Sequence, residues 1–114
     1  MCRVDLAEGK LDGLAARVRE LMDFLNRQHH YYDEANAAMV LAETFLKSGE
    51  QKEMVEPVMR LLDLSARYDY DYWLKNQIRR VPAVFEYEDI AERLPPDLRE
   101  ELAIAKNEIG RAHV

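Results

Sequence analysis

The chain has 114 residues, of which 48% are apolar and 33% are charged, and its 22 acidic and 16 basic side chains give a net charge of -6. This composition is typical of one globular domain with a modest core and excludes a disordered chain. Because the net charge repels nucleic-acid phosphates and anionic lipid, direct binding to nucleic acid or to a membrane is not expected.

Cysteine usage and hydropathy indicate the compartment. Cys2 is the only cysteine, so no disulfide can form within the chain, which favours a reducing environment. The first ten residues lack the apolar centre of a signal peptide, and nowhere do 18 apolar residues follow one another. We therefore expect a cytoplasmic protein, with residues 1–10 and 111–114 as tails.

Three long helices are predicted first along the chain. Apolar residues spaced by three and four run from Leu11 to Leu25, which indicates an amphipathic helix. A second helix is expected at about residues 33–47, with Asp33 as its N-cap and Gly49 in the left-handed conformation after its end. A third is expected at about residues 52–68, with Pro57 near its first turn.

The C-terminal part is predicted to hold three more helices, at about residues 70–80, 83–93 and 96–108. The first should end before Pro82, and Pro96 suits the first position of the last helix. The fold class is therefore all-α, with about six helices. The facing stripes of the first three helices should form one core, with these residues mostly buried: Leu21, Leu25, Ala42, Phe45, Leu62 and Tyr68.

Two segments resemble each other at an offset of 40 residues. RELMDFLNRQ begins at Arg19, and MRLLDLSARY begins at Met59, so that two apolar residues followed by an aspartate take equivalent positions in each. An offset of this size is typical of stacked helical repeats.

The sequence between these copies, AMVLAETFLKSGEQKEM, resembles a tetratricopeptide repeat in its Leu41-Ala42 pair, its aromatic Phe45 and its turn residue Gly49. Met54 replaces the usual alanine. The repeat length of about 40 residues is more similar to the helical sensor regions of bacterial multidomain transcriptional activators. The resemblance covers residues 11–72 and implies antiparallel helix pairs stacked as a right-handed superhelix, with residues 73–110 as capping helices.

The segment SARYDYDYWLKNQIRR is unusually aromatic and basic. One interpretation is an aromatic surface flanked by bases, suited to an acidic peptide or to base stacking. The favoured interpretation is a cap on the last repeat, in which Leu74 and Ile78 dock on the preceding helix and Asp71 pairs with Lys75. The candidate partner-binding residues are Tyr68, Tyr72, Trp73, Lys75, Arg79 and Arg80.

Other polar clusters favour structure over chemistry. In HHYYDE, which begins at His29, adjacent histidines on a helix point about 100° apart, so a helix junction is favoured over a metal site. The carboxylates of EYEDIAER should surround one solvated helix rather than act as general acids. The glycines stand alone, and no nucleophile is placed with a histidine in a recognisable motif. No metal, cofactor or catalytic activity is expected.

The predicted function is a non-catalytic module for protein–protein interaction or signal sensing, as a regulatory fragment of a transcriptional regulator. Its partner would be another protein or an adjacent domain of a longer chain. A truncated array should expose apolar surface, so a homodimer is predicted. The alternative is a free-standing dimeric helical bundle that binds a small ligand in a pocket lined by Phe45, Tyr68 and Trp73.

Overall fold

The structure, a computed structural model, describes the backbone of residues 2–112 and the side chains of residues 13–107. Every regular element in residues 2–112 is a helix, so the all-α prediction is confirmed. The side chains of Cys2 and His113 lie outside the described residues. In chain order the elements are α1 (Cys2–Arg27), α2 (Tyr31–Ser48), the 3-10 helix η1 (Gln51–Met54), α3 (Val55–Tyr68), α4 (Asp71–Arg80), α5 (Pro82–Phe85), α6 (Glu88–Ala91) and α7 (Pro96–Ala112).

The element bounds differ from the predicted ones in several places, and α7 continues to Ala112, into the expected tail of residues 111–114. The backbone of residues 2–10, expected to be a tail, continues α1. The helix expected at residues 83–93 is divided into α5 and α6, because Tyr87 between them is extended, with ψ of 129°. The N-cap prediction for Asp33 is wrong: α2 begins two residues earlier, after His30, and makes no side-chain cap hydrogen bond.

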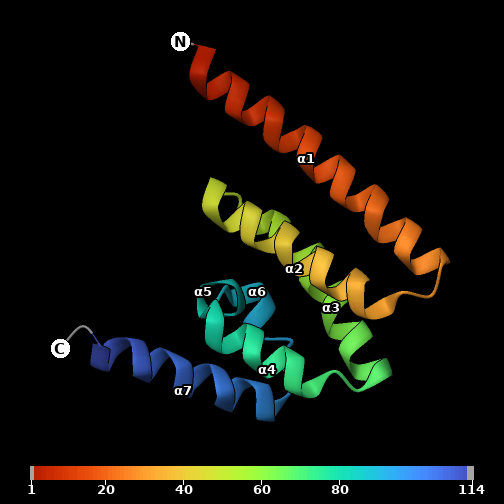
Figure 1. The fold of residues 1–114 in the computed structure, drawn as a ribbon. Helices are drawn as coiled ribbons and strands as arrows, with labels where there is room; N and C mark the ends of the chain where they lie inside the picture. Colours follow the sequence, from red (N-terminus) through yellow and green to blue (C-terminus); the bar gives the residue numbers. More distant parts are fainter. Residues whose placement is uncertain (1, 113–114) are drawn as a thin grey trace.

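Helix α2 is the centre of the fold. It packs against α1, α3, η1 and α5. Figure 1 shows that α1, α2 and α3 alternate in direction, with α1 and α4 on opposite sides of α2. Ala35, Ala38 and Ala42 of α2 are fully buried, and these small side chains allow the neighbouring backbones to approach closely.

Left-handed residues end the long helices at a regular interval. His29, Gly49 and Asp69 stand 20 residues apart and have φ of 62°, 82° and 61°. After each, the next residue donates its N–H to the carbonyl five positions earlier, which is the closure of a Schellman motif. These hydrogen bonds are His30 to Leu25 (2.8 Å), Glu50 to Phe45 (2.9 Å) and Tyr70 to Ser65 (3.1 Å).

The intervals between these turns are equally regular. Residues 31–48 and residues 51–68 each contain 18 helical residues, the second set divided into η1 and α3. The 40-residue echo in the sequence therefore corresponds to the same turn geometry at His29 and Asp69, and the left-handed prediction for Gly49 is confirmed.

The predicted core is correct in part. Ala42 and Phe45 are buried, and Leu25 and Leu62 are half-buried, but Leu21 is 48% exposed and Tyr68 is 38% exposed. On α1 it is Met22 that is buried against the core, and Leu21 points about 100° away from it because successive helical residues are rotated by that angle.

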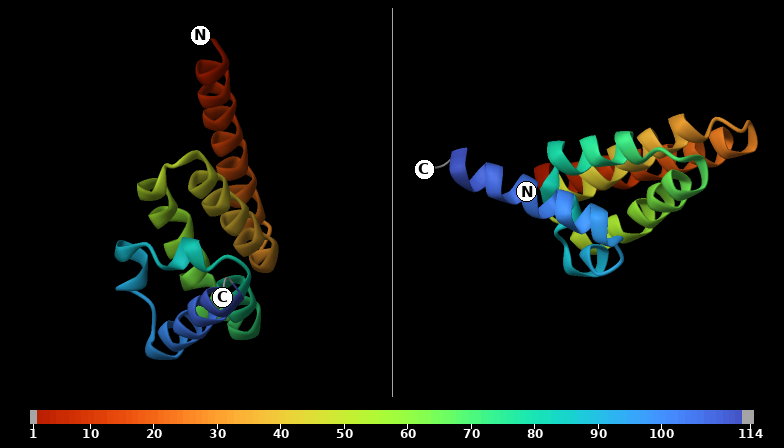
Figure 2. Two further views of the ribbon diagram at one scale, coloured as in Figure 1. Left: turned by 90° about the vertical axis from the view of Figure 1, so that its left-hand side faces the viewer. Right: turned by 90° about the horizontal axis from the view of Figure 1, so that it is seen from below.

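The C-terminal helices form a second part of the same core. Helix α4 packs against α7 and α5, and the views in Figure 2 show α7 running beside α4 in the same direction. Leu74 and Ile78 are buried, as predicted for the apolar face of this helix, and so are Val84, Phe85 and Ile90. Among the described residues, no helix is both long enough and apolar enough to cross a bilayer.

Candidate functional site

The two aromatic segments of the sequence meet at one corner of the molecule. The rings of Tyr31 and Tyr68 are stacked, with centroids 4.4 Å apart and planes inclined by 8°. Tyr32 meets Tyr70 edge-on at 5.3 Å and Trp73 at 6.1 Å. The turn between α1 and α2 is thereby joined to the turn between α3 and α4.

Trp73 lies inside this corner rather than on an exposed aromatic surface. It is 8% exposed, and its indole N–H donates to Oδ1 of Asn36 at 3.0 Å. Tyr72 is 81% exposed. The three predicted aromatic residues thus have three different environments, because Tyr68 is stacked, Trp73 is buried and Tyr72 faces solvent.

The predicted basic residues are engaged by carboxylates. Lys75 pairs with Asp71 at 3.2 Å, as the spacing of four residues predicted. Arg80 pairs with Glu43 of α2 at 2.5 Å, and Arg79 pairs with the mostly buried Glu101 of α7. Arg79 and Arg80 thus join α4 to neighbouring helices, and the partner-binding role of these bases stays a prediction.

A buried carboxylate joins the first three helices. Glu34 of α2 is 1% exposed and accepts hydrogen bonds from Asn26 of α1 at 2.9 Å and from Nε of Arg60 of α3 at 2.5 Å. Arg60 also donates to Asp23 of α1 at 3.1 Å. Burial lowers the pKa of Arg60, but its hydrogen bonds to Glu34 and Asp23 outweigh burial and raise the pKa overall. These groups form a structural ion-pair network.

The pKa values of two tyrosines in the aromatic corner are raised above the ordinary tyrosine value. Hydrogen bonding with Tyr68 raises the pKa of Tyr31, and Nδ1 of His29 also lies 2.6 Å from the Tyr31 hydroxyl. Burial raises the pKa of Tyr70. Both side chains are therefore neutral hydrogen-bonding groups at physiological pH. Among the described residues, no group of three or more His, Cys, Asp or Glu side chains is arranged to hold a metal ion.

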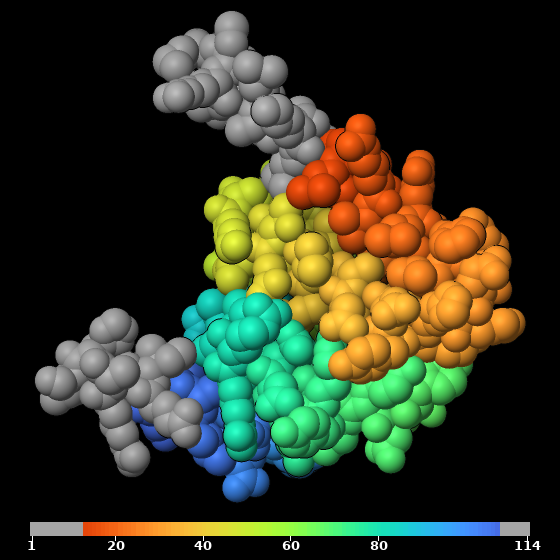
Figure 3. Space-filling view, viewed as in Figure 1, coloured from red at the N-terminus to blue at the C-terminus, as the bar shows by residue number. Residues whose placement is uncertain are grey.

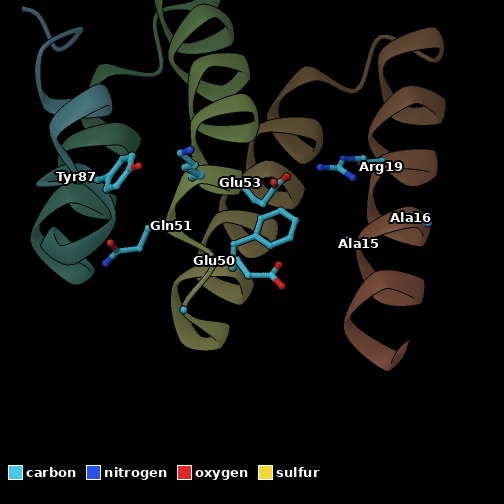
Figure 4. A pocket seen from close by; sticks show the side chains of 10 residues that line it. Ala15, Ala16, Arg19, Glu50, Gln51, Glu53 and Tyr87 are labelled. Atoms are coloured by element: carbon cyan, nitrogen blue, oxygen red, sulfur yellow. The ribbon is translucent and has the colours of Figure 1, made fainter. Parts of the chain in front are cut away.

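An open groove of about 790 Å3 lies between α1 and the turn that follows α2. Figure 4 shows Arg19 reaching from α1 toward this turn, with Tyr87 on the far side. The Arg19 guanidinium lies 5.7 Å from the centroid of the Phe45 ring. Lys52, Glu50 and Glu53 also line the groove, so its charges are balanced and do not select a ligand of one sign.

The ligand pocket of the alternative hypothesis is not formed as predicted. Phe45 lines the groove beside Arg19, whereas Tyr68 stacks on Tyr31 at the other end of α2. Tyr31 and Phe45 are 14 residues apart on this helix, about 21 Å along its axis. Phe45, Tyr68 and Trp73 therefore do not line one pocket.

Helix α1 carries an apolar stripe that no described element covers. Leu14, Leu21 and Phe24 are 46%, 48% and 49% exposed, although Ala15 and Met22 on the neighbouring face are buried. Spacings of seven and three residues place the three exposed side chains on one side of the helix. In Figure 3 the orange atoms of α1 form the upper right border of the molecule, with nothing beyond them.

The sequence did not reveal Tyr31, Tyr32 and Glu34 as contacts between helices. A usable signal existed for the two tyrosines, because the 40-residue offset relates the turn at His29 to the turn at Asp69 and so gives HHYYDE and DYDYWL equivalent positions. Glu34 carries no such signal, since its burial depends on Arg60, which is 26 residues away.

In comparisons with known proteins, no family model, no curated protein and no solved structure matches the chain.

Proposed function

We propose that this chain is a non-catalytic helical-repeat module of the tetratricopeptide-like class, and that it acts by binding other helices on the outer face of α1. One observation carries the proposal: Leu14, Leu21 and Phe24 form a half-exposed apolar stripe beside a buried face of the same helix. Large exposed apolar stripes mark interaction surfaces in otherwise well-packed proteins.

The regular turns support the class of module. Left-handed residues at intervals of 20 produce antiparallel helices of equal length, the arrangement from which stacked repeats are built. In such a stack each helix pair buries its face against the next pair. The stripe on α1 has the composition expected of a surface that receives a further helix.

A second copy of the chain is the occupant that the charges of α1 favour. When two α1 helices pair antiparallel with Leu14 of one copy near Phe24 of the other, Arg17, which lies within the stripe, comes level with Leu21 of the partner and close to the neighbouring Glu20. Because the pair has two-fold symmetry, both Arg17–Glu20 ion pairs form at once. We propose a two-fold homodimer built on this contact.

Sedimentation equilibrium of the full chain tests this proposal. We expect association at about 100 μM and a loss of affinity of about tenfold in Leu21→Gln. Ile104→Gln is the matched control, because Ile104 is a half-exposed apolar residue on α7 and its substitution should leave association unchanged. A monomer at millimolar concentration, or an equal effect of both variants, would contradict the dimer.

A charge exchange tests the antiparallel arrangement. Glu20→Arg should weaken the dimer because it brings like charges together, and adding Arg17→Glu to it should restore the affinity. Failure of the double variant to recover would rule out this pairing even if a dimer forms.

The biological setting proposed for the module is regulatory. Its support is the resemblance of residues 11–72 to the helical sensor regions of bacterial transcriptional activators, in which a helical array contacts an adjacent domain. The low content of cysteine agrees with a cytoplasmic location. Co-purification of an effector protein with the wild-type chain and not with Leu21→Gln is the expected result.

A further inference from the structure

A second groove, distinct from the α1 stripe, lies among α3, α4 and α7. Its volume is about 480 Å3. Its floor is apolar and includes Met59 and Leu62 of α3, Leu74 of α4 and Leu98 of α7. Leu74 and Leu98 belong to the buried core, whereas Met59 and Leu62 are half-buried and present apolar surface to the groove.

The rim of this groove is acidic. Four aspartates and one arginine line it, and all five are exposed. The four aspartates are Asp63, Asp69, Asp71 and Asp97, and the arginine is Arg93. The groove thus combines an apolar floor with a rim that carries a surplus of three negative charges.

Two of the aspartates have no basic partner in the described part of the chain. Asp63 pairs with Arg67 at 3.3 Å, and Asp71 pairs with Lys75 at 3.2 Å, each within its own helix. For Asp69 and Asp97 the described residues provide no ion pair. Asp69 is held in place as the left-handed residue that ends α3, and Asp97 lies in the first turn of α7.

We propose that this groove binds a basic amphipathic helix of a partner protein, with large apolar side chains on the floor and Lys or Arg residues beside Asp69 and Asp97. An amphipathic helix fits a groove of this kind when its apolar face follows positions i, i+3, i+4 and i+7. The acidic rim selects a basic flank, because it repels acidic peptides and attracts basic ones.

The openness of the groove favours a peptide over a small molecule. Small-ligand sites enclose most of the ligand surface. Here every charged rim residue is exposed, so the outer side of any occupant stays in water. An amphipathic helix fits this arrangement, since its polar face can stay in contact with water.

The probe is a fluorescein-labelled helical peptide with Leu at i, i+3, i+4 and i+7 and with Lys and Ala elsewhere. Its binding to the full chain is measured by fluorescence anisotropy. We expect micromolar affinity, which falls as salt concentration rises. Asp69→Asn with Asp97→Asn should weaken binding about tenfold, because it removes the two carboxylates available to the probe. Asparagine suits the left-handed position of Asp69, so this double variant should fold.

The matched control is Glu50→Gln with Glu53→Gln. It makes the same change in net charge but alters the groove beside Arg19. Its affinity for the probe should stay within about twofold of the wild-type value. An equal loss in both double variants would show binding to overall negative charge and would overturn the proposal.

The apolar floor is tested separately. Leu62→Ala should lower the affinity for the amphipathic probe. A scrambled peptide of identical composition should bind poorly even to the wild-type chain. Equal binding of both peptides, or displacement of the probe by decylamine at equal concentration, would overturn the assignment to a helix. Leu21→Gln, which disrupts the proposed α1 contact, should leave this binding intact, so the two proposals can fail independently.

Discussion

The first three helices and the C-terminal helices are held together by different means. Helices α1, α2 and α3 end at left-handed residues spaced by 20, and the buried network around Glu34 joins all three. The elements from α4 to α7 differ in length from 4 to 17 residues. They pack through large apolar side chains and through ion pairs in which the basic partner is exposed.

The contrast shows how side-chain size decides what fills an interface. On α2, small residues such as Ala38 and Ala42 bring helices close, and the long polar side chains of Glu34 and Arg60 then reach across from one helix to the next. The short C-terminal helices cannot supply such a regular contact. Phe85 and Ile90 fill the larger space between them. The stability of this part therefore depends on the volume of its buried apolar side chains rather than on pairing between polar side chains.

The largest expected effect is loss of volume in the C-terminal part. Phe85→Ala should lower the free energy of unfolding by about 3–5 kcal/mol, because it leaves a cavity at a fully buried position. Phe45→Ala should cost less, since its ring borders an open groove that water can enter. Urea denaturation measures both, and an equal cost would mean that Phe45 is as tightly enclosed as Phe85.

The buried network is the corresponding weak point of the first three helices. Glu34→Ala should lower the free energy of unfolding by about 3 kcal/mol, because it leaves Arg60 without its buried partner. Asp63→Asn is the control, since Asp63 and Arg67 are both exposed and their pair should contribute less than about 0.5 kcal/mol. Similar midpoints for the two variants in chemical denaturation would refute this role for Glu34.

The regular turns can be tested at Gly49. Gly49→Ala should lower the free energy of unfolding by about 1–2 kcal/mol, because an L side chain is strained at φ of 82°. No atom lies within 4 Å of the added Cβ, so strain and not a clash is responsible. Asp69→Gly, which removes a side chain from the same conformation, should be neutral or slightly stabilising; a cost equal to that of Gly49→Ala would show that the turns are not equivalent.

The contribution of each basic residue of α4 to stability should depend on how deeply its acidic partner is buried. Arg79→Gln should lower the free energy of unfolding by about 1 kcal/mol, because Glu101 is mostly buried and loses its partner. Lys75→Gln should change it by less than about 0.5 kcal/mol, since Lys75 and Asp71 lie on the same helix and both side chains are partly exposed. Thermal unfolding of both variants checks the order, which the opposite ranking would contradict.

The smallest effect concerns pH. Because the pKa values of Tyr31 and Tyr70 are raised in the folded chain, their contribution to stability is present below the ordinary tyrosine pKa of about 10 and is lost as pH rises above it. Absorbance titration at alkaline pH should show that some tyrosines ionise at a higher pH than ordinary tyrosine. Tyr31→Phe should remove part of this high-pH phase. Ionisation of all six tyrosines in one ordinary step would contradict this expectation.

The sequence alone determined the helices and most of their ends. Apolar spacing and proline positions are local properties, and they predicted six helical segments, the left-handed Gly49 and the buried face of Leu74 and Ile78. The 40-residue echo also coincides with the recurrence of the turn geometry of His29 at Asp69. These features depend on residues within a few turns of one another.

Only the tertiary structure decided which side of each helix became interior. Leu21 and Met22 are both apolar neighbours on α1, and the position of α2 buries one and exposes the other. Trp73 and the arginines of α4 contact Asn36, Glu43 and Glu101, which belong to distant segments of the chain. A pairing of this kind depends on how helices approach in space, and periodicity within one helix does not specify that approach.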